Sequence, residues 1–239
     1  MTNAERFISS YNKIDRTLRT LYNYKPYFSF SEIVRKSSIV NYVVKKYEQK
    51  LIDYARLRNA IVHQGDSEQI IAEPHLDVVE EFEAIEGLIC SPPTALDSVA
   101  KKDITTLDAS TKLIDVIRTI YETSYSNIPI LENNKLIGIA NNKFLVQSIA
   151  KAILEKQSLD IFLRDTVVKE ILSDSMTDVY YTILNEKATL VQVMDEFEKN
   201  KKLLAIIITK NGNNLERLLG LITAYDVVAV TEILDNYGG

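Results

Sequence analysis

The sequence predicts an α+β protein in which an N-terminal α-helical bundle is followed by a tandem pair of β-α-β-β-α units. Apolar residues recur at helical spacing through the first ninety residues, and no strand pattern interrupts them. The segment Gly220–Asp226, GLITAYD, ends an apolar run and opens a helical one, and a weaker copy, Gly138–Phe144, lies 82 residues earlier. Pro92 and Pro93 separate the two kinds of pattern. The predicted domains are residues 1–91 (bundle), 95–158 (first repeat) and 159–239 (second repeat).

The composition is that of an ordinary globular protein, with 46% hydrophobic and 26% charged residues. A net charge of −5 gives no global positive field, so nucleic-acid binding would need a local basic patch. Cys90 is the only cysteine, which excludes an intrachain disulfide framework and a Cys-based zinc cage. We expect no metal site, no required cofactor and a cytoplasmic location. The N-terminus lacks the apolar core of a signal peptide, and the apolar run Leu203–Ile208 is too short to cross a membrane.

Three helices account for the N-terminal pattern. Phe7, Tyr11, Ile14 and Leu18 recur at four- and three-residue spacing, which predicts a first helix that ends before Pro26. A short helix or turn is expected over residues 29–37. Further apolar stripes predict a long second helix over about 39–64, capped by Gly65, and a third helix between Pro74 and Pro92. Helices of this length with short connections suit an antiparallel bundle.

The end of the second predicted helix carries Arg58-Asn59-x-x-x-His63. This pattern resembles the signature of the HEPN superfamily, small helical bundles of which many are dimeric, metal-independent ribonucleases. The resemblance implies a homodimer with an active site assembled from two chains. In it His63 would act as general acid and base, Arg58 would anchor a phosphate and Asn59 would orient the groups. The residue types suit RNA cleavage, because an imidazole moves protons near neutral pH and a guanidinium binds phosphate as a fork.

Helical geometry leaves a structural alternative open. On an ideal helix Asn59 and His63 share a face, whereas Arg58 lies about 140° around from His63. Arg58 would then pair with an acid of the bundle such as Asp15, and His63 would be a helix C-terminal residue favoured by the helix dipole. His75 is expected at the surface, in the first turn of the third helix.

The C-terminal part repeats one unit. The first copy is predicted as a strand over 104–107, a helix over 110–123, and two strands over 128–131 and 136–140 joined by a turn. The second copy follows at an offset of 77, with strands over 181–184 and 205–208, and then at 82 for the strand over 218–223. The extra residues fall in the turn at 210–214, where insertions are tolerated. Residues 145–175 are predicted to be a helical connection.

This order of elements, with a strand ending in Gly-Leu-Ile-Thr-x-x-Asp, resembles the CBS domain over residues 95–235. CBS domains occur in tandem pairs whose clefts often bind adenosine-type ligands such as AMP, ATP, S-adenosylmethionine or cyclic dinucleotides, including cyclic di-AMP. The resemblance implies that Asp226 accepts ribose hydroxyls and that Thr223 contacts phosphate or ribose. The adenine would be contacted by edge strands around Tyr181 and Ala205. A structural alternative is that Thr223 and Asp226 only cap the helix that follows.

The first copy departs from the motif. Asn141 stands where the motif has Thr, and Phe144 stands where it has Asp. A phenylalanine side chain cannot accept a ribose hydroxyl. We therefore expect one nucleotide site in each chain, although Lys143 would still be able to meet a phosphate.

Together these patterns predict a cytoplasmic homodimer that senses an adenine nucleotide through its repeat pair and controls a HEPN-like unit that binds or cleaves RNA. Two other functions fit the same residues. The protein would be a non-catalytic, nucleotide-sensing dimer that signals to a partner protein, or a structural adaptor that binds no nucleotide.

Overall fold

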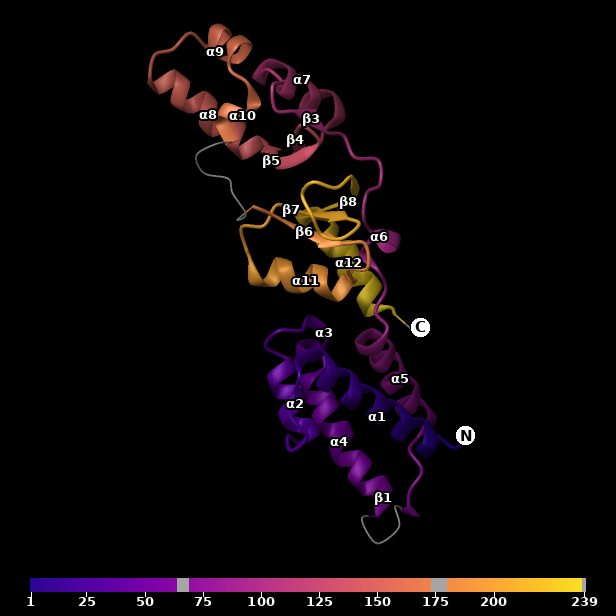
Figure 1. Ribbon diagram of the computed structural model, residues 1–239. Coiled ribbons are helices and arrows are strands. Elements are labelled where there is room, and N and C mark those ends of the chain that lie inside the picture. The colour runs from indigo at the N-terminus through magenta and orange to yellow at the C-terminus, as the bar shows by residue number, and fades with distance from the viewer. Residues whose placement is uncertain (64–68, 173–179, 238–239) are drawn as a thin grey trace. The chain divides into compact units, whose positions relative to one another are not determined.

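The structure is a computed structural model that describes residues 1–63, 69–172 and 180–237 (Figure 1). The chain divides into two compact units. Unit 1 comprises Met1–Pro93, Thr189–Asp195 and Val228–Gly239, and unit 2 comprises Thr94–Ala188 and Glu196–Val227. The predicted fold class is confirmed, since a helical N-terminal region precedes two three-stranded sheets. The predicted repeat boundaries, 95–158 and 159–239, stay a prediction.

The N-terminal region is helical, as its apolar periodicity predicts. Side-chain caps define two of the helix starts, because Thr2 with Glu5 and Ser29 with Glu32 form capping boxes. The elements are α1 (Asn3–Tyr22), α2 (Phe30–Ser37), α3 (Tyr42–Lys46), α4 (Glu48–Ile61), β1 (Val62–His63), β2 (Gln69–Ile70) and α5 (Leu76–Cys90).

Two predictions for this region are wrong. The single helix expected over 39–64 is divided at Tyr47, whose backbone (φ −104°, ψ 14°) leaves the helical range between α3 and α4. It also ends earlier, because Val62 is extended (φ −109°, ψ 120°) and enters the antiparallel β1–β2 pair, where no strand was expected. The predicted cap Gly65 lies outside the described residues.

The core of unit 1 is aromatic. The Phe7 and Phe82 rings lie with centroids 4.6 Å apart, and Tyr54 packs on both at 5.6 Å and 4.6 Å. Phe7 and Phe82 are fully buried. These rings come from α1, α4 and α5, so one cluster joins three helices whose apolar stripes are visible in the sequence.

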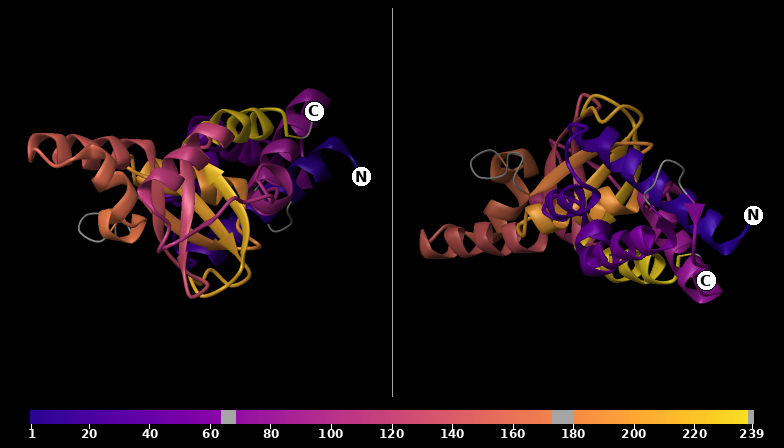
Figure 2. Two further views of the ribbon diagram at one scale, coloured as in Figure 1. Left: turned by 90° about the horizontal axis from the view of Figure 1, so that it is seen from above. Right: turned by 90° about the horizontal axis from the view of Figure 1, so that it is seen from below.

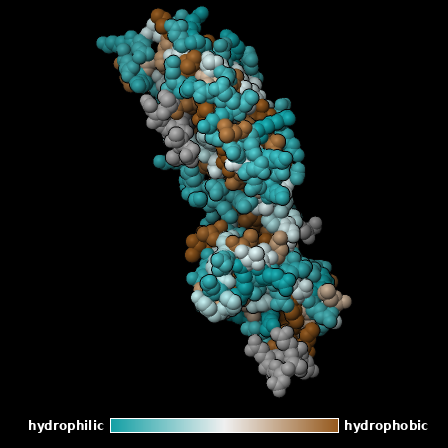
Figure 3. Space-filling view, in the orientation of Figure 1, coloured by the Kyte–Doolittle hydropathy of each residue, from teal (hydrophilic) through white to brown (hydrophobic). Residues whose placement is uncertain are grey.

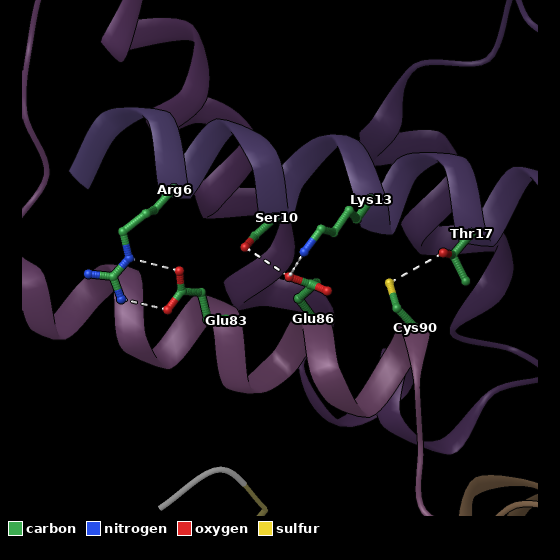
Figure 4. A network of polar contacts seen from close by, with 7 residues as sticks. All are labelled: Arg6, Ser10, Lys13, Thr17, Glu83, Glu86 and Cys90. Atoms are coloured by element: carbon green, nitrogen blue, oxygen red, sulfur yellow. Dashed lines mark hydrogen bonds and ion pairs between the residues drawn. The ribbon is translucent and has the colours of Figure 1, made fainter. Parts of the chain in front are cut away.

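Polar contacts line the edge of the α1–α5 packing (Figure 4). The Arg6 guanidinium donates to both oxygens of Glu83, at 2.9 Å and 2.6 Å, and Ser10 Oγ donates to Glu86 at 3.1 Å. The hydrogen bonds from Arg6 lower the pKa of Glu83 below its ordinary value. Such a bidentate pair fixes the register of two helices that apolar packing alone would leave free to slide.

Cys90 makes the last of these polar contacts between α1 and α5 (Figure 4). Its thiol accepts a hydrogen bond from Thr17 Oγ1 at 3.3 Å, and burial raises its pKa. A raised pKa keeps the thiol protonated at neutral pH, so Cys90 serves packing and lacks the thiolate that a nucleophile needs.

The elements of the C-terminal part follow the predicted order, with small shifts at their ends. In the first repeat they are α6 (Ala95–Ser98), β3 (Leu107–Asp108), α7 (Leu113–Thr123), β4 (Asn127–Glu132), β5 (Lys135–Asn141) and α8 (Asn142–Leu154). The helical connection holds α9 (Leu159–Asp165) and α10 (Val168–Leu172). The second repeat has β6 (Tyr181–Asn185), α11 (Leu190–Lys199), β7 (Ala205–Thr209), β8 (Leu218–Thr223), the 3-10 turn η1 (Ala224–Asp226) and α12 (Val227–Asp235). Residues of α11 and α12 fall in both units.

The two sheets of unit 2 have the same topology. The first strand of each sheet pairs parallel with the second, and the second pairs antiparallel with the third, giving orders β3-β4-β5 and β6-β7-β8. The sheets pack against one another around a shared core (Figure 1) that consists of Leu136, Ile139, Tyr181, Ala205, Ile207 and Leu221. Figure 2 shows α8 extending to one side of these sheets, and Figure 3 shows mostly hydrophilic side chains on the visible face of this unit.

The Arg6–Glu83 pair predicts how stability depends on pH. Because the folded-state pKa of Glu83 is lowered, its contribution is present above the unfolded-state pKa and is lost as the pH falls through the folded-state value. The unfolding free energy of the wild type should fall as the pH is lowered from about 7 to about 4. We expect a smaller fall in Glu83→Gln, which lacks the titrating carboxylate. The difference should stay below about 1 kcal/mol, since the pair is partly exposed.

Urea denaturation at both pH values measures this difference. Glu232→Gln, at an exposed position of α12 in the same unit, is the matched control and should keep the wild-type pH dependence. An equal loss in Glu83→Gln and in the wild type would contradict the role given to the pair.

Candidate functional site

A cavity of about 370 Å³ opens in unit 2 beside the end of β8. Three segments line it: the chain that precedes β3, the loop between α7 and β4, and the β8–η1 junction. The lining residues are Lys101, Asp103, Ile104, Thr105, Ser124, Tyr125, Ser126, Asn127, Leu221, Thr223, Tyr225 and Asp226. Two of these segments belong to the first repeat and one to the second, so neither repeat forms the cavity alone.

Thr223 and Asp226 form one wall of the cavity. The Asp226 carboxylate accepts hydrogen bonds through Oδ2 from the Thr223 backbone N–H at 2.7 Å and from Thr223 Oγ1 at 2.9 Å. These bonds fix the carboxylate at the point where β8 turns into η1 and α12. Helix capping therefore accounts for one carboxylate oxygen, and acceptor positions on the group remain for a ligand.

The opposite wall is held in place by backbone pairing between the repeats. Lys101 N–H donates to the Leu221 carbonyl at 2.9 Å, and Leu221 N–H donates back to the Lys101 carbonyl at 3.0 Å. This antiparallel bridge ties the segment that leads into β3 to the middle of β8. The predicted strand over 104–107 is consequently shorter than expected, with only Leu107–Asp108 paired to β4.

The bridge needs the glycine that begins the motif. A Cβ on Gly220 would lie 2.8 Å from the Ala100 Cβ and 3.1 Å from the Leu96 Cδ1. Real Cβ atoms do not approach that closely, so only glycine lets β8 lie against the segment that carries Lys101 and Asp103. The motif glycine thereby contributes to the site through packing, without contact with a ligand.

Tyr125 and Lys101 form an electrostatic contact inside the cavity. The Lys101 Nζ lies 3.3 Å from the centroid of the Tyr125 ring, which places the ammonium over the aromatic face. A second tyrosine, Tyr225, lines the cavity with 82% of its surface exposed. The cavity thus offers a held ammonium, a fixed carboxylate and aromatic surface.

Comparison with known families decides what this unit is. The model of the CBS domain family matches residues 96–142 and 168–232. This part of the chain is a tandem pair of CBS domains. Among curated proteins no match was found.

Solved structures similar to this CBS pair are themselves CBS-domain proteins. A CBS domain-containing protein of unknown function from Kribbella flavida DSM 17836 shares 10% identity over 59% of this chain and 99% of its own, with a TM-score of 0.48. CBSX2 in complex with AMP shares 16% identity over 60% and 99%, with a TM-score of 0.45. The CBS domain pair of MJ0100, in complex with 5′-methylthioadenosine and S-adenosylmethionine, shares 17% identity over 59% and 97%, with a TM-score of 0.44.

The residues expected to contact an adenine are placed differently from the prediction. Tyr181 and Ala205 do not line the cavity beside Asp226, because they pair with each other in the β6–β7 ladder and belong to the core between the sheets. The repeat offset of 77 relates Tyr181 to Ile104, which does line the cavity. The motif of one CBS repeat thus lines the cavity together with the segment that precedes β3 of the other repeat. Adenine contact by Tyr181 and Ala205 stays a prediction.

At the first repeat, Phe144 replaces the motif aspartate and is 6% exposed. Its ring lies edge-on to Tyr180, with centroids 4.8 Å apart, and Leu204 packs against the same cluster. Asn141, in the motif threonine position, donates to Asn127 Oδ1 at 2.6 Å and to the Ser126 carbonyl at 3.0 Å. Apolar packing and internal hydrogen bonds therefore occupy the positions that hold Thr223 and Asp226 in the second repeat.

In unit 1, Arg58 and Asn59 lie in the last turn of α4, with Asn59 exposed and Arg58 partly buried. The Arg58 guanidinium lies 5.8 Å from the Tyr11 ring centroid, while Asp15 forms its ion pair with Arg19 at 2.7 Å. His63 follows the helix in β1, so the shared helical face expected for Asn59 and His63 does not form. The helix ends at Ile61 because Val62 is extended.

Among the described residues, no group of three or more His, Cys, Asp or Glu side chains is arranged to hold a metal ion. Within the same residues, no helix combines the length and apolar character needed to cross a membrane.

The close approach at Gly220 predicts an asymmetry between the two repeats. Gly220→Ala should lower the unfolding free energy by about 1–3 kcal/mol, because the new methyl group meets a Cβ that cannot rotate away. Gly138→Ala, at the equivalent position of the first repeat, is the matched control. Its methyl group meets the Leu172 Cδ1 at 3.2 Å, and that side chain can change rotamer. Denaturant unfolding of both variants measures the difference, and equal costs would argue against a special role for Gly220.

Proposed function

We propose that the CBS pair binds an adenosine-type ligand in the cavity beside Asp226 and that binding regulates the helical unit. The observation that carries the proposal is the open cavity itself, with the motif residues Thr223 and Asp226 on its wall. Its volume of about 370 Å³ falls within the roughly 300–1,000 Å³ that small-molecule sites occupy. The CBS family match supports the same class of ligand.

The lining groups suit the parts of a nucleoside. A carboxylate offers about four acceptor positions, of which Thr223 uses two on Asp226, so vicinal ribose hydroxyls have acceptors left. The exposed ring of Tyr225 suits a purine ring. AMP, ATP and S-adenosylmethionine carry both ribose hydroxyls, whereas cyclic di-AMP offers only the 2′-hydroxyl because its 3′ oxygens are esterified. The proposal covers these four ligands.

Regulation follows from the composition of the cavity. Because both repeats supply its walls, a ligand contacts both and stabilises one packing of the pair over others. In this proposal the protein is a cytoplasmic homodimer, and the ligand-stabilised packing changes the behaviour of its helical unit.

Asp226→Asn tests the ligand site. The carboxylate that accepts ribose hydroxyls would be lost, and hydrogen bonds to charged groups contribute about 1.5–3 kcal/mol, so we expect AMP affinity to fall about tenfold or more. Isothermal titration calorimetry measures the affinity. Asp108→Asn is the control, because that carboxylate binds Ser110 and does not line the cavity. Absence of binding to the wild type by all four adenosine ligands would refute the proposal and favour a structural adaptor.

A second proposal concerns unit 1, which we propose to be a HEPN-like unit that cleaves RNA without a metal. It is supported by Arg58 and exposed Asn59 in the last turn of α4, with His63 following directly in β1. In this proposal His63 transfers protons, Arg58 holds a phosphate and Asn59 orients the reacting groups. A second copy of the chain completes the active site.

His63→Ala tests the catalytic proposal in a gel assay with RNA in the presence of a chelator. General acid–base catalysis contributes about 10²–10⁴-fold, so we expect cleavage to fall by at least about a hundredfold. His75→Ala is the matched control, because His75 is the other histidine of the chain and lies exposed before α5. Equal cleavage by the wild type and by His63→Ala would exclude this chemistry, and a nucleotide-sensing dimer that signals to a partner protein would then account for unit 1.

A further inference from the structure

The charges around the cavity are few and unequal. Lys101 is the only basic residue among those described as lining it, whereas Asp103 and Asp226 are acidic. The other lining residues are uncharged at neutral pH. A ligand in this cavity therefore meets one ammonium and two carboxylates.

The single ammonium has little freedom to serve several phosphates. Its backbone is held on both sides by the hydrogen bonds with Leu221, and its Nζ lies over the Tyr125 ring at 3.3 Å. The Lys101 ammonium is placed to pair with one phosphate next to Tyr125. A triphosphate carries about two more negative charges than a monophosphate. These charges would lie near Asp103 or Asp226, and the lining of the cavity offers no second cation to neutralise them.

An adjacent hollow adds charges of both signs. It shares Asp103 and Ile104 with the cavity and adds the cations Lys102 and Arg217, but it also adds Glu216. Lys102 forms an ion pair with Asp97 at 3.4 Å. Asp103 lines both spaces, so a carboxylate borders each of the spaces that a phosphate chain would occupy.

We propose that the site selects adenosine derivatives with one phosphate or none over nucleoside triphosphates, and that Asp103 is the residue that sets this selectivity. This inference rests on the proposed function, since it concerns the ligand of the same cavity. It narrows the ligand class to adenosine, AMP and sulfonium derivatives such as S-adenosylmethionine. In this proposal the Lys101 ammonium attracts the phosphate of AMP, so it favours the monophosphate over the free nucleoside.

Calorimetry with the full chain tests the selectivity. Adenosine, AMP, ATP and S-adenosylmethionine are titrated at equal ionic strength in magnesium-free buffer. We expect AMP to bind at least about tenfold more tightly than ATP, a ratio that corresponds to ~1.4 kcal/mol. Asp103→Asn should strengthen ATP binding and so lower the ratio of AMP affinity to ATP affinity. Lys101→Gln should weaken AMP binding several-fold more than it weakens adenosine binding. Asp108→Asn, outside the lining, should keep all wild-type ratios.

The outcomes separate the two proposals. If ATP binds as tightly as AMP, or if Asp103→Asn leaves the ratio unchanged, the selectivity is refuted while adenosine-ligand binding stands. Arg217→Gln then shows whether the adjacent hollow holds the phosphates, because it would weaken ATP alone. If none of these four ligands binds, and cyclic di-AMP does not bind either, both proposals fall.

Discussion

The site depends on one interaction, the pair of backbone hydrogen bonds between Lys101 and Leu221. These bonds join a segment of the first repeat to a strand of the second, and they require the absence of a side chain at Gly220. Through them, Lys101 and Asp103 come to face Thr223 and Asp226 across one cavity. A local backbone contact thus sets the distance between the charges that a ligand would meet.

The two repeats share a topology and differ in what fills the motif positions. In the second repeat a carboxylate is fixed at the start of a helix and faces an open cavity. In the first repeat Phe144 is buried against Tyr180 and contributes to the core of its sheet and helices. Replacing a buried ring by a carboxylate there would cost both packing and desolvation, because a buried charge needs a partner. The motif positions therefore serve apolar packing in the first repeat and line a cavity in the second, although residues of both repeats form that cavity.

In the helical unit, packing between aromatic rings holds the helices together, and polar pairs favour one alignment of neighbouring helices. Phe7, Tyr54 and Phe82 join three helices in one cluster. The Arg6–Glu83 pair at its edge is partly exposed and contributes little free energy, and its two parallel hydrogen bonds favour the observed alignment of α1 and α5.

The sequence by itself determined the fold class, the order of elements in both repeats and the two motif residues on the cavity wall, because periodicity and capping are local properties of the chain. It did not determine the end of α4 or the β1–β2 pair, since Val62 leaves the helix to pair with a strand further along the chain. Nor did the sequence predict which residues of the first repeat line the cavity. Ile104, which corresponds to Tyr181 at the repeat offset of 77, lines it, whereas Tyr181 does not. Only the tertiary structure decided this, because packing the sheets against one another sets the motif of one repeat beside the segment that precedes β3 of the other.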